Sequence, residues 1–278
     1  MSNIILERTI NLVKELLKSE LDTITVERSV LGLFFTGVKL STGHGGLCFT
    51  PVKEMPEAVC CPSSARAMPL SGRLSGRPVS DYLEYIFSDN PLKKALGIAA
   101  LNALSAILFE RGDYDIQAAD TFDEIEPTDY GKVTAVDALV PIINKLIASD
   151  SDFSILELDP KTLKEREMKY FVPADRADTV VPYSDLLVIT GVTILNDTLP
   201  GLLEMAKPGA EIAVTGPTAG MIPDVLFDMG VTIAGGILVT DADGLLDIIA
   251  EGGSGYHFFG KYAERTVIKK TKPIKTGL

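Results

Sequence analysis

Three segments of the sequence place glycine at or directly after the end of a short apolar run, and two of them add hydroxyl or amide side chains. They are 189–198, 215–218 and 234–236. Glycine lets a ligand approach the backbone, hydroxyl and amide groups make directional hydrogen bonds, and free N–H groups at helix starts favour an anion. The pattern predicts a ligand-binding crevice, while ordinary turn and capping chemistry is the alternative for each segment. The candidate ligand-binding residues in these segments are Thr190, Gly191, Thr193, Thr198, Gly216, Pro217 and Gly235.

Asn196 is the leading catalytic candidate in these segments. It stands just before Asp197 and Thr198, either of which can cap the next helix. Its amide can donate a hydrogen bond to a ligand and also accept one. The alternative is that Asn196 is itself the helix cap.

Acidic side chains stand at the ends of two other apolar runs. Asp137 follows the run 133–136, and the run 153–158 carries Glu157 and leads to Asp159. An acid after the second strand of a nucleotide-binding sheet often bonds a ribose hydroxyl, and acids that are merely solvated are the alternative. No glycine follows the first run, so the dinucleotide fingerprint is missing and NAD is not favoured. Asp137 is therefore a catalytic candidate and Glu157 a ligand-binding candidate.

The N-terminal half contributes three further candidates. His44 lies among glycines in a hairpin-type loop, where it either transfers a proton, contacts a metal or has no role. Arg77 ends the stretch 71–77, which repeats Ser-Gly-Arg and suits an anionic group unless it is only a solvated loop. Asn102 is a polar residue on an otherwise apolar helix, so it either pins the packing or reaches a domain interface.

The chain has three cysteines, Cys48, Cys60 and Cys61, which do not make a disulfide framework. Together with His44 they are the only cluster of soft metal ligands in the sequence. Adjacent residues of an extended chain point to opposite sides, and no Cys-x-x-Cys spacing occurs. We predict that no tightly held ion is coordinated by Cys60 and Cys61 together, and that Cys48 is a core residue.

Composition excludes several classes of partner. The 278 residues carry a formal net charge of −12, which repels a phosphate backbone, so nucleic acid is not an expected partner. No run of 18 or more apolar residues and no leader-like N-terminus is visible, so we expect no membrane partner and a cytoplasmic location.

The periodicity of apolar residues predicts an α/β protein in two parts. Residues 3–19 have the stripe of an amphipathic helix, 23–52 read as three short antiparallel strands, and 91–109 read as a buried helix. Beyond an acidic stretch, strands and helices alternate, as in a parallel sheet with helices on both faces. The predicted strands there are 133–136, 153–158, 185–190, 210–215 and 231–235, with an edge strand at 266–270. The predicted helices there are 139–149, 197–207, 222–229 and 241–250.

We predict a division into two domains, because the pattern of apolar residues and predicted elements changes at the acidic stretch. Residues 1–112 form a small α+β domain, 113–131 form an acidic linker, and 132–278 form the α/β domain.

The sequence resembles a full-length member of the heavy-metal chelation protein family of bacteria and archaea. The stretches that carry the resemblance are 46–50, 74–77, 95–103, 189–198, 207–210 and 214–218. The resemblance implies an enolase N-terminal-like domain followed by a Rossmann-like domain, with a site between them that is partly similar to that of Rossmann-like methyltransferases. It also implies a role in making or handling pterin, flavin or siderophore-like chelators.

Three functions remain open from the sequence. The first is an enzyme that acts on a small anionic molecule of this kind by condensation or hydrolysis. The second is a protein that binds a metal or metallophore without turnover, and the third is methyl transfer from S-adenosylmethionine. The sequence identifies no cofactor. The expected partner is an anionic small molecule, and a homodimer is a further expectation.

Overall fold

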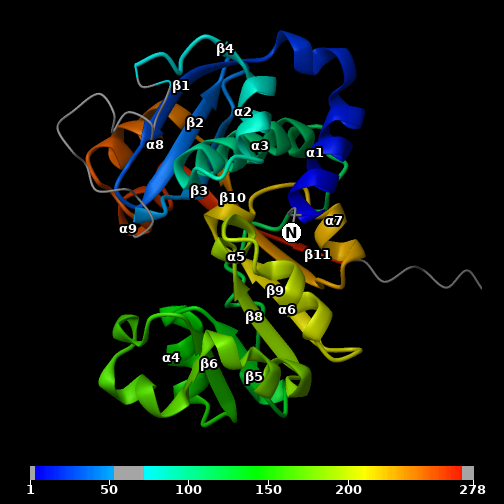
Figure 1. Cartoon of the computed structure of the whole chain (residues 1–278), viewed down its shortest axis with the longest axis vertical. Coiled ribbons are helices and arrows are strands. Elements are labelled where there is room, and N and C mark those ends of the chain that lie inside the picture. The colour runs from blue at the N-terminus through cyan, green and yellow to red at the C-terminus, as the bar shows by residue number, and fades with distance from the viewer. Residues whose placement is uncertain (1–3, 53–69, 71, 271–278) are drawn as a thin grey trace, which may run out of the picture.

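Two β-sheets, one antiparallel and one mostly parallel, organise the computed structural model, which describes residues 4–52, 70 and 72–270 (Figure 1). The antiparallel sheet has the order β3-β2-β1-β4, and the larger sheet has the order β11-β10-β9-β8-β5-β6-β7. The predicted fold class, a small α+β part followed by a mostly parallel sheet with helices, is confirmed.

The strands are β1 Thr25–Leu31, β2 Phe35–Leu40, β3 Gly45–Phe49, β4 Arg77–Pro78, β5 Val133–Val136, β6 Phe153–Glu157, β7 Phe171–Pro173, β8 Leu186–Thr190, β9 Glu211–Thr215, β10 Ile233–Val239 and β11 Ala263–Lys269. The α-helices are α1 Ile4–Leu17, α2 Val79–Tyr85, α3 Pro91–Glu110, α4 Val140–Ala148, α5 Val192–Leu195, α6 Leu199–Met205, α7 Asp224–Asp228, α8 Ala242–Ala250 and α9 Gly255–Phe258. Short 3₁₀ segments join them, among them η9 Pro217–Ala219.

The larger sheet has the strand order of a doubly wound fold. From β5 the chain runs outward through β6 and β7, then crosses to the other side of β5 and continues through β8, β9 and β10. The direction of winding therefore switches between β5 and β8, and ligands of such sheets bind at the carboxyl ends of the strands on either side of that point. β11 closes the edge antiparallel to β10, as the sequence predicts.

Alternating apolar side chains cover both faces of the parallel strands. In β8, Leu186 and Val188 pack with α4 on one face, whereas Leu187 and Ile189 pack with α6 on the other. Residues of one strand that are two apart share a face, so an unbroken apolar run buries both sides of the sheet. This is why the predicted strands of the second half are all present.

Two differences from the predicted elements have physical causes. The expected strand 231–235 begins at Ile233 and continues to Val239, because β11 pairs with it over its whole length. The short strand β7 was not predicted, because three residues that end in proline carry too little pattern to identify a strand.

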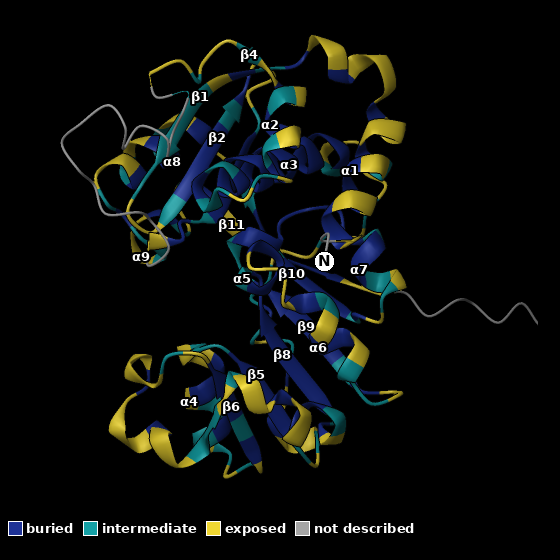
Figure 2. Ribbon diagram, in the orientation of Figure 1, coloured by how far each residue is buried: buried dark blue, intermediate teal, exposed yellow. Residues whose placement is uncertain are grey.

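α3 is the central helix of the antiparallel part and is buried almost all round (Figure 2). Asn90 caps it by accepting from the backbone N–H groups of Leu92 and Lys93, and Pro91 occupies the first turn. The helix is long and apolar enough to cross a membrane, but 89% of its most apolar window is buried inside the protein. It packs against β2, β3, α1 and α2, as a core helix does.

The two parts of the chain interlock. α8, from the C-terminal half, lies on β1 and β2, where Gly37 leaves room for Leu246 and Ile249. α3 lies against the same antiparallel sheet and also contacts α5 and η9. One hydrophobic core consequently joins residues of α1 and α3 to residues of the large sheet.

The acidic segment 113–131 packs against the large sheet. Gln117 forms an isolated bridge with Val267 of β11, Thr121 is buried, and Ile125 is fully buried in the core under α4. The domain division at this segment stays a prediction.

Gly46 of β3 provides a test of the contact between the antiparallel sheet and α3. A Cβ at this position would stand 2.2 Å from the carbonyl oxygen of Ala99 and 2.4 Å from the backbone nitrogen of Ala103. Gly46→Ala should therefore lower the free energy of unfolding by about 1–3 kcal/mol, as overpacking does, measured by urea unfolding with circular dichroism. Gly201→Ala in α6 is the matched control, because its Cβ meets nothing within 4 Å. It should raise stability by about 0.5–1 kcal/mol. Equal effects of the two substitutions would contradict the packing described.

Candidate functional site

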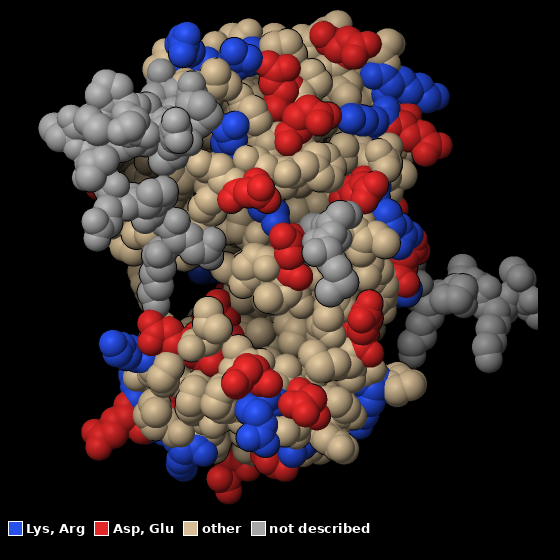
Figure 3. Space-filling model, viewed as in Figure 1, with Lys and Arg blue, Asp and Glu red and all other residues tan. Residues whose placement is uncertain are grey.

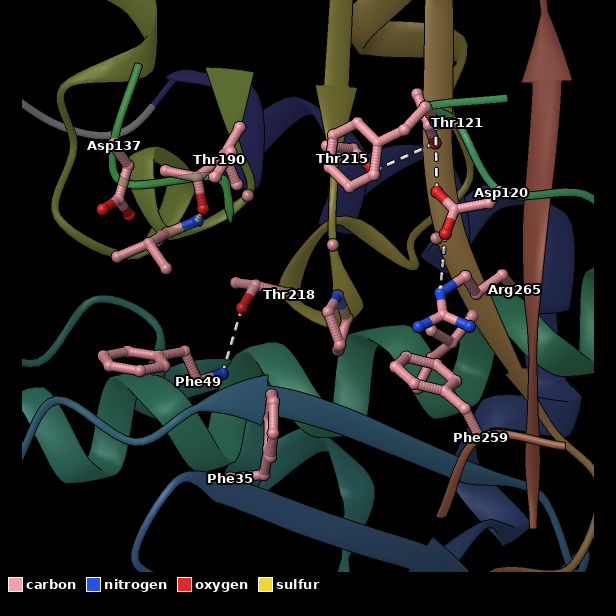
Figure 4. A pocket seen from close by; sticks show the side chains of 18 residues that line it. Phe35, Phe49, Asp120, Thr121, Asp137, Thr190, Thr215, Thr218, Phe259 and Arg265 are labelled. Carbon is pink, nitrogen blue, oxygen red and sulfur yellow. Dashed lines mark hydrogen bonds and ion pairs between the residues drawn. The ribbon is translucent and has the colours of Figure 1, made fainter. Parts of the chain in front are cut away.

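A cavity of about 330 Å³ lies at the carboxyl ends of the parallel strands (Figure 4). Asp137 directly after β5, Thr190 at the end of β8, and Thr215 at the end of β9 line it together. These strands include β5 and β8, which stand on either side of the switch in winding. The cavity thus occupies the place where a doubly wound sheet binds its ligands.

Asp137 has an uncommon backbone conformation. Its φ of +79° is in the left-handed region, where a residue with a side chain costs on the order of 1 kcal/mol or more. Two hydrogen bonds hold it there: its own N–H donates to the carbonyl of Leu156 at 2.9 Å, and its Oδ1 accepts from the N–H of Ala138 at 2.7 Å. The turn thereby places a carboxylate in the cavity wall at the end of β5.

Arg265 of β11 lies on the opposite side of the cavity from Asp137 (Figure 4). Its Nε is 3.1 Å from Oδ2 of Asp120, and its guanidinium carbon is 3.8 Å from the centre of the Phe259 ring. An ion pair at the edge and an aromatic ring beneath the plane fix the orientation of the guanidinium. No bond of its two terminal amino groups is found within the described ranges 4–52, 70 and 72–270.

The acidic segment reaches the cavity through Thr121. Its hydroxyl accepts from Thr215 Oγ1 at 2.9 Å. Gly235 of β10 makes this possible, because a Cβ there would stand 1.8 Å from Thr121 Oγ1 and 2.7 Å from Thr215 Oγ1. Gly235, predicted to bind a ligand, lies beneath this hydrogen bond, and its neighbour Gly236 lines the cavity instead.

The antiparallel part supplies an aromatic wall. Phe35 of β2 and Phe49 at the end of β3 line the cavity, and the N–H of Phe49 donates to Thr218 Oγ1 at 3.0 Å. The apolar lining also includes Phe122, Leu139, Val192, Ile237 and Phe259. The lining therefore comes from both halves of the chain, and its apolar surface is largely aromatic.

Asn102 of α3 holds the two halves together behind this wall. Its Nδ2 donates to the carbonyls of Leu47 at 2.7 Å, Thr218 at 3.1 Å and Pro217 at 3.2 Å. Asn102 does not line the cavity, but it fixes the loop after β9 that does. Both roles considered for it from the sequence, pinning the packing and reaching the interface, apply.

Among the residues predicted to bind or catalyse, the structure brings one group together in the cavity wall. These are Asp137, Thr190, Gly191, Gly216 and Pro217.

Asn196 and its neighbours are engaged in local structure. Asn196 Oδ1 accepts from the backbone N–H of Thr198 at 3.2 Å and from its hydroxyl at 2.6 Å, which makes an Asx turn before α6. Thr193 of α5 donates its hydroxyl to the carbonyl of Thr190 at the end of β8. None of Asn196, Thr198 and Thr193 lines the cavity.

The remaining candidates also lie away from the cavity. His44 is 3.0 Å from Glu110 Oε2, and Arg77 pairs with Asp81 at 2.7 Å. Glu157 accepts from the N–H groups of the next two residues through Oε1, while its Oε2 is buried and makes no hydrogen bond within the described part of the chain.

Phe35, Phe49, Asp120, Phe259 and Arg265 line the cavity and were not predicted. The only signal in the sequence for Asp120 was the acidic stretch itself. The four others are brought to the cavity by pairing and packing between distant segments.

The described residues do not assemble a metal site of their own. Among them, no group of three or more His, Cys, Asp or Glu side chains is arranged to hold an ion. Cys48 is buried in the core, as predicted, whereas Cys60 and Cys61 lie outside the described residues.

Comparison with known proteins identifies relatives of both halves of the chain. Two family models, DUF364 over residues 120–268 and DUF4213 over residues 14–105, match it, and both carry the description "Putative heavy-metal chelation". An uncharacterised protein of Methanocaldococcus jannaschii is 26% identical over 192 residues, which cover 68% of this chain and 71% of that protein.

Two solved structures share the fold. A DUF364-family protein of unknown function from Pyrococcus horikoshii aligns with a TM-score of 0.77 at 20% identity, over 96% of this chain and 100% of that one. A second protein of this family and of unknown function, from Desulfitobacterium hafniense, aligns with a TM-score of 0.72 at 22% identity, over 94% and 100%.

Gly235→Ala tests whether Thr121 packs directly against β10 at Gly235. The new methyl group should displace Thr121, break its hydrogen bond with Thr215 and lower stability by about 1–3 kcal/mol, measured by urea unfolding. The double variant Gly235→Ala, Thr121→Gly removes the clashing side chain, so its loss should be smaller than the sum of the two single losses. Strict additivity would show that the two residues do not interact.

Cys48 provides a test that depends on pH. Burial raises the pKa of its thiol to about 12, although a hydrogen bond with Thr218 acts in the opposite direction. At pH 8.5 the folded protein therefore holds this thiol protonated, and thiols react as thiolates. Iodoacetamide should leave Cys48 unmodified in the native protein and modify it in denaturing urea, as read by peptide mass spectrometry. Rapid native modification at this pH would contradict the burial of Cys48.

Proposed function

Because the chain belongs to the DUF364 family, whose description is "Putative heavy-metal chelation", we propose that its cavity binds a small organic molecule with a planar, apolar body, through which a metal is handled. The observation that carries this proposal is the aromatic cavity at the ends of β5, β8 and β9.

The size and lining of the cavity support a small-molecule ligand. Pockets for small molecules commonly have volumes of about 300–1,000 Å³ and combine apolar walls with a few placed polar groups. This cavity is near the lower end at about 330 Å³. Phe35 and Phe49 offer ring surfaces for a flat molecule, and Thr190 and Thr215 offer hydroxyls at the strand ends.

The surface of the molecule is hollowed, which supports access of a ligand from solvent. The face drawn in Figure 3 is hollowed between the part that holds the antiparallel sheet and the part that holds α4 and β6, with acidic side chains at the rim. Lys and Arg are scattered among Asp and Glu over this face and form no continuous patch on it.

The chelation named in the family description is better explained by a chelating ligand than by side chains that bind a metal directly. The described residues offer no cluster of three or more donor side chains, whereas the cavity offers apolar surface with separated polar groups. A molecule that holds the metal itself requires no such cluster.

Methyl transfer from S-adenosylmethionine receives less support from the geometry. The acid expected to hold a ribose, Glu157, bonds backbone N–H groups of its own turn and does not line the cavity. Condensation or hydrolysis of a pterin, flavin or siderophore-like compound, and a cytoplasmic location, stay predictions. Among the cavity residues, Asp137 is the one whose backbone conformation supports a chemical role, because backbone strain of this kind is concentrated at functional sites.

Filling the cavity tests the proposal. Anilinonaphthalene sulfonate is a fluorescent probe with an aromatic body and one sulfonate group, and the wild-type protein should bind it in about a one-to-one ratio. Leu139→Trp and Val192→Trp each add an indole to the cavity wall, so each should weaken binding by about tenfold or more, which is roughly 1.4 kcal/mol.

Leu158→Trp is the matched control, because Leu158 is 84% exposed and does not line the cavity. It should leave the affinity unchanged. Absence of binding to the wild type, or equal binding by all variants, would exclude the cavity as the site.

A further inference from the structure

We propose that Arg265 binds an anionic group of the ligand, so that the ligand class of this cavity is an aromatic or heteroaromatic ring that carries a carboxylate. This inference rests on the proposed function, which supplies the cavity and the aromatic body. It adds the charge of the ligand and the side chain that recognises it. The argument for it begins with the place of Arg265 in β11.

Arg265 interrupts the apolar face of β11. Side chains that are two apart in a strand share a face, and its neighbours on that face, Ala263 and Val267, are fully buried. In the antiparallel pairing with β10, Arg265 stands opposite Ile237, and both residues line the cavity. A positive charge therefore stands on the apolar face of the strand at the point where that face meets the cavity.

The orientation of the Arg265 guanidinium is fixed by two contacts. Asp120 Oδ2 lies 3.1 Å from its Nε, and the centre of the Phe259 ring lies 3.8 Å from its central carbon. Figure 4 shows the two terminal amino groups turned away from Asp120. Within the part of the chain that the structure describes, these two groups bond no other residue. They form the edge that accepts a planar carboxylate in a two-pronged geometry.

The walls of the cavity favour an aromatic body for the molecule that carries this anion. Phe35, Phe49 and Phe259 line the cavity together with Arg265. Rings pack favourably against such walls in offset or edge-to-face arrangements. A ring bound there also excludes water, and a charged hydrogen bond is stronger where water is excluded.

The two acids of the lining leave the terminal edge of Arg265 accessible. Asp120 lies at Nε, and Asp137 lies on the opposite side of the cavity, where its Oδ1 accepts from the N–H of Ala138 (Figure 4). Three strands lie between β5 and β11, so four spacings of about 4.8 Å separate these two strands by roughly 19 Å. An anion at Arg265 is therefore in direct contact with the guanidinium and remote from the turn that holds Asp137.

Two features limit how strongly Arg265 selects an anion. Asp120 offsets part of its positive charge, and the Arg265 side chain is 47% exposed, so that solvent screens the remainder. We therefore expect a preference for an anionic ligand at the lower end of the range for charged hydrogen bonds, which is about tenfold in affinity.

Matched probes test the inference by displacement of a neutral fluorescent dye. N-Phenyl-1-naphthylamine carries no charge at pH 7 and reports whether the cavity is occupied, and 2-naphthoate and 2-naphthamide compete with it. The two competitors have the same ring system and planar substituents of similar shape, but only 2-naphthoate is charged. Wild-type protein should bind 2-naphthoate about tenfold more tightly than 2-naphthamide.

Substitutions of two cations in β11 assign that preference. Arg265→Gln should reduce the affinity ratio of the two competitors to about one and leave the affinity for the neutral dye unchanged. Arg265→Lys should keep only part of the ratio, because lysine lacks the planar fork. Lys269→Gln is the matched control, since Lys269 pairs with Glu124 at 2.6 Å and does not line the cavity. It removes the same charge from the same strand and should keep the tenfold ratio.

Thermal melts without ligand establish that each variant is folded. If Arg265→Gln does not fold, Arg265→Lys decides the assignment by its reduced ratio. A ratio that falls equally in Lys269→Gln and Arg265→Gln would show that the net charge of the protein, and not contact with Arg265, sets the preference.

The other outcomes separate this inference from the proposed function. Equal affinities of the wild type for 2-naphthoate and 2-naphthamide, or a tenfold ratio that persists in both Arg265 variants, would overturn the role of Arg265 and leave the cavity as a site for neutral aromatic molecules. Failure of both competitors to displace the bound dye would also overturn it. Failure of the dye to bind, and of both competitors in titration calorimetry, would overturn the proposed function as well.

Discussion

One buried amide holds the cavity in shape. Asn102, 4% exposed at the middle of α3, donates hydrogen bonds to carbonyls of β3 and of the loop after β9. These carbonyls lie between the two halves of the chain, where water cannot easily replace the amide, and each unsatisfied group would cost about 1–3 kcal/mol. Because Pro217 and Thr218 line the cavity, the position of its wall depends on this side chain of a helix that never reaches the cavity itself.

The apolar character of α3 follows from its position between the two halves of the chain. A helix that packs against the antiparallel sheet on one side and contacts α1, α2, α5 and η9 on others has almost no face left for solvent. Its sequence therefore resembles a membrane span in composition, although it is the core helix that joins the two halves. Gly46 of β3 lets the backbones of β3 and α3 approach each other, and Asn102 supplies hydrogen bonds at the same contact.

The sequence predicts those parts of the site that follow from strand order and fails where distant segments meet. Asp137, Thr190 and Gly216 stand directly after apolar runs, and parallel strands bring such residues to one edge whatever surrounds them. The positions of Phe49, Phe259 and Arg265 depend instead on the register of antiparallel pairs and on the docking of the two halves. Local competition explains Asn196, because a short amide side chain is easily satisfied by the backbone of its own turn.

The turn at Asp137 restricts which residue types can stand there, but it does not require a charge. A residue is needed there that tolerates a φ of +79° and accepts a hydrogen bond from the next N–H, and asparagine meets both conditions as well as aspartate does. The negative charge is therefore not needed for the turn. The turn nevertheless places this carboxylate in the wall of the cavity. Because backbone strain of this kind is concentrated at functional sites, the positive φ of Asp137 and its place in the cavity wall both support a role for this residue in the cavity.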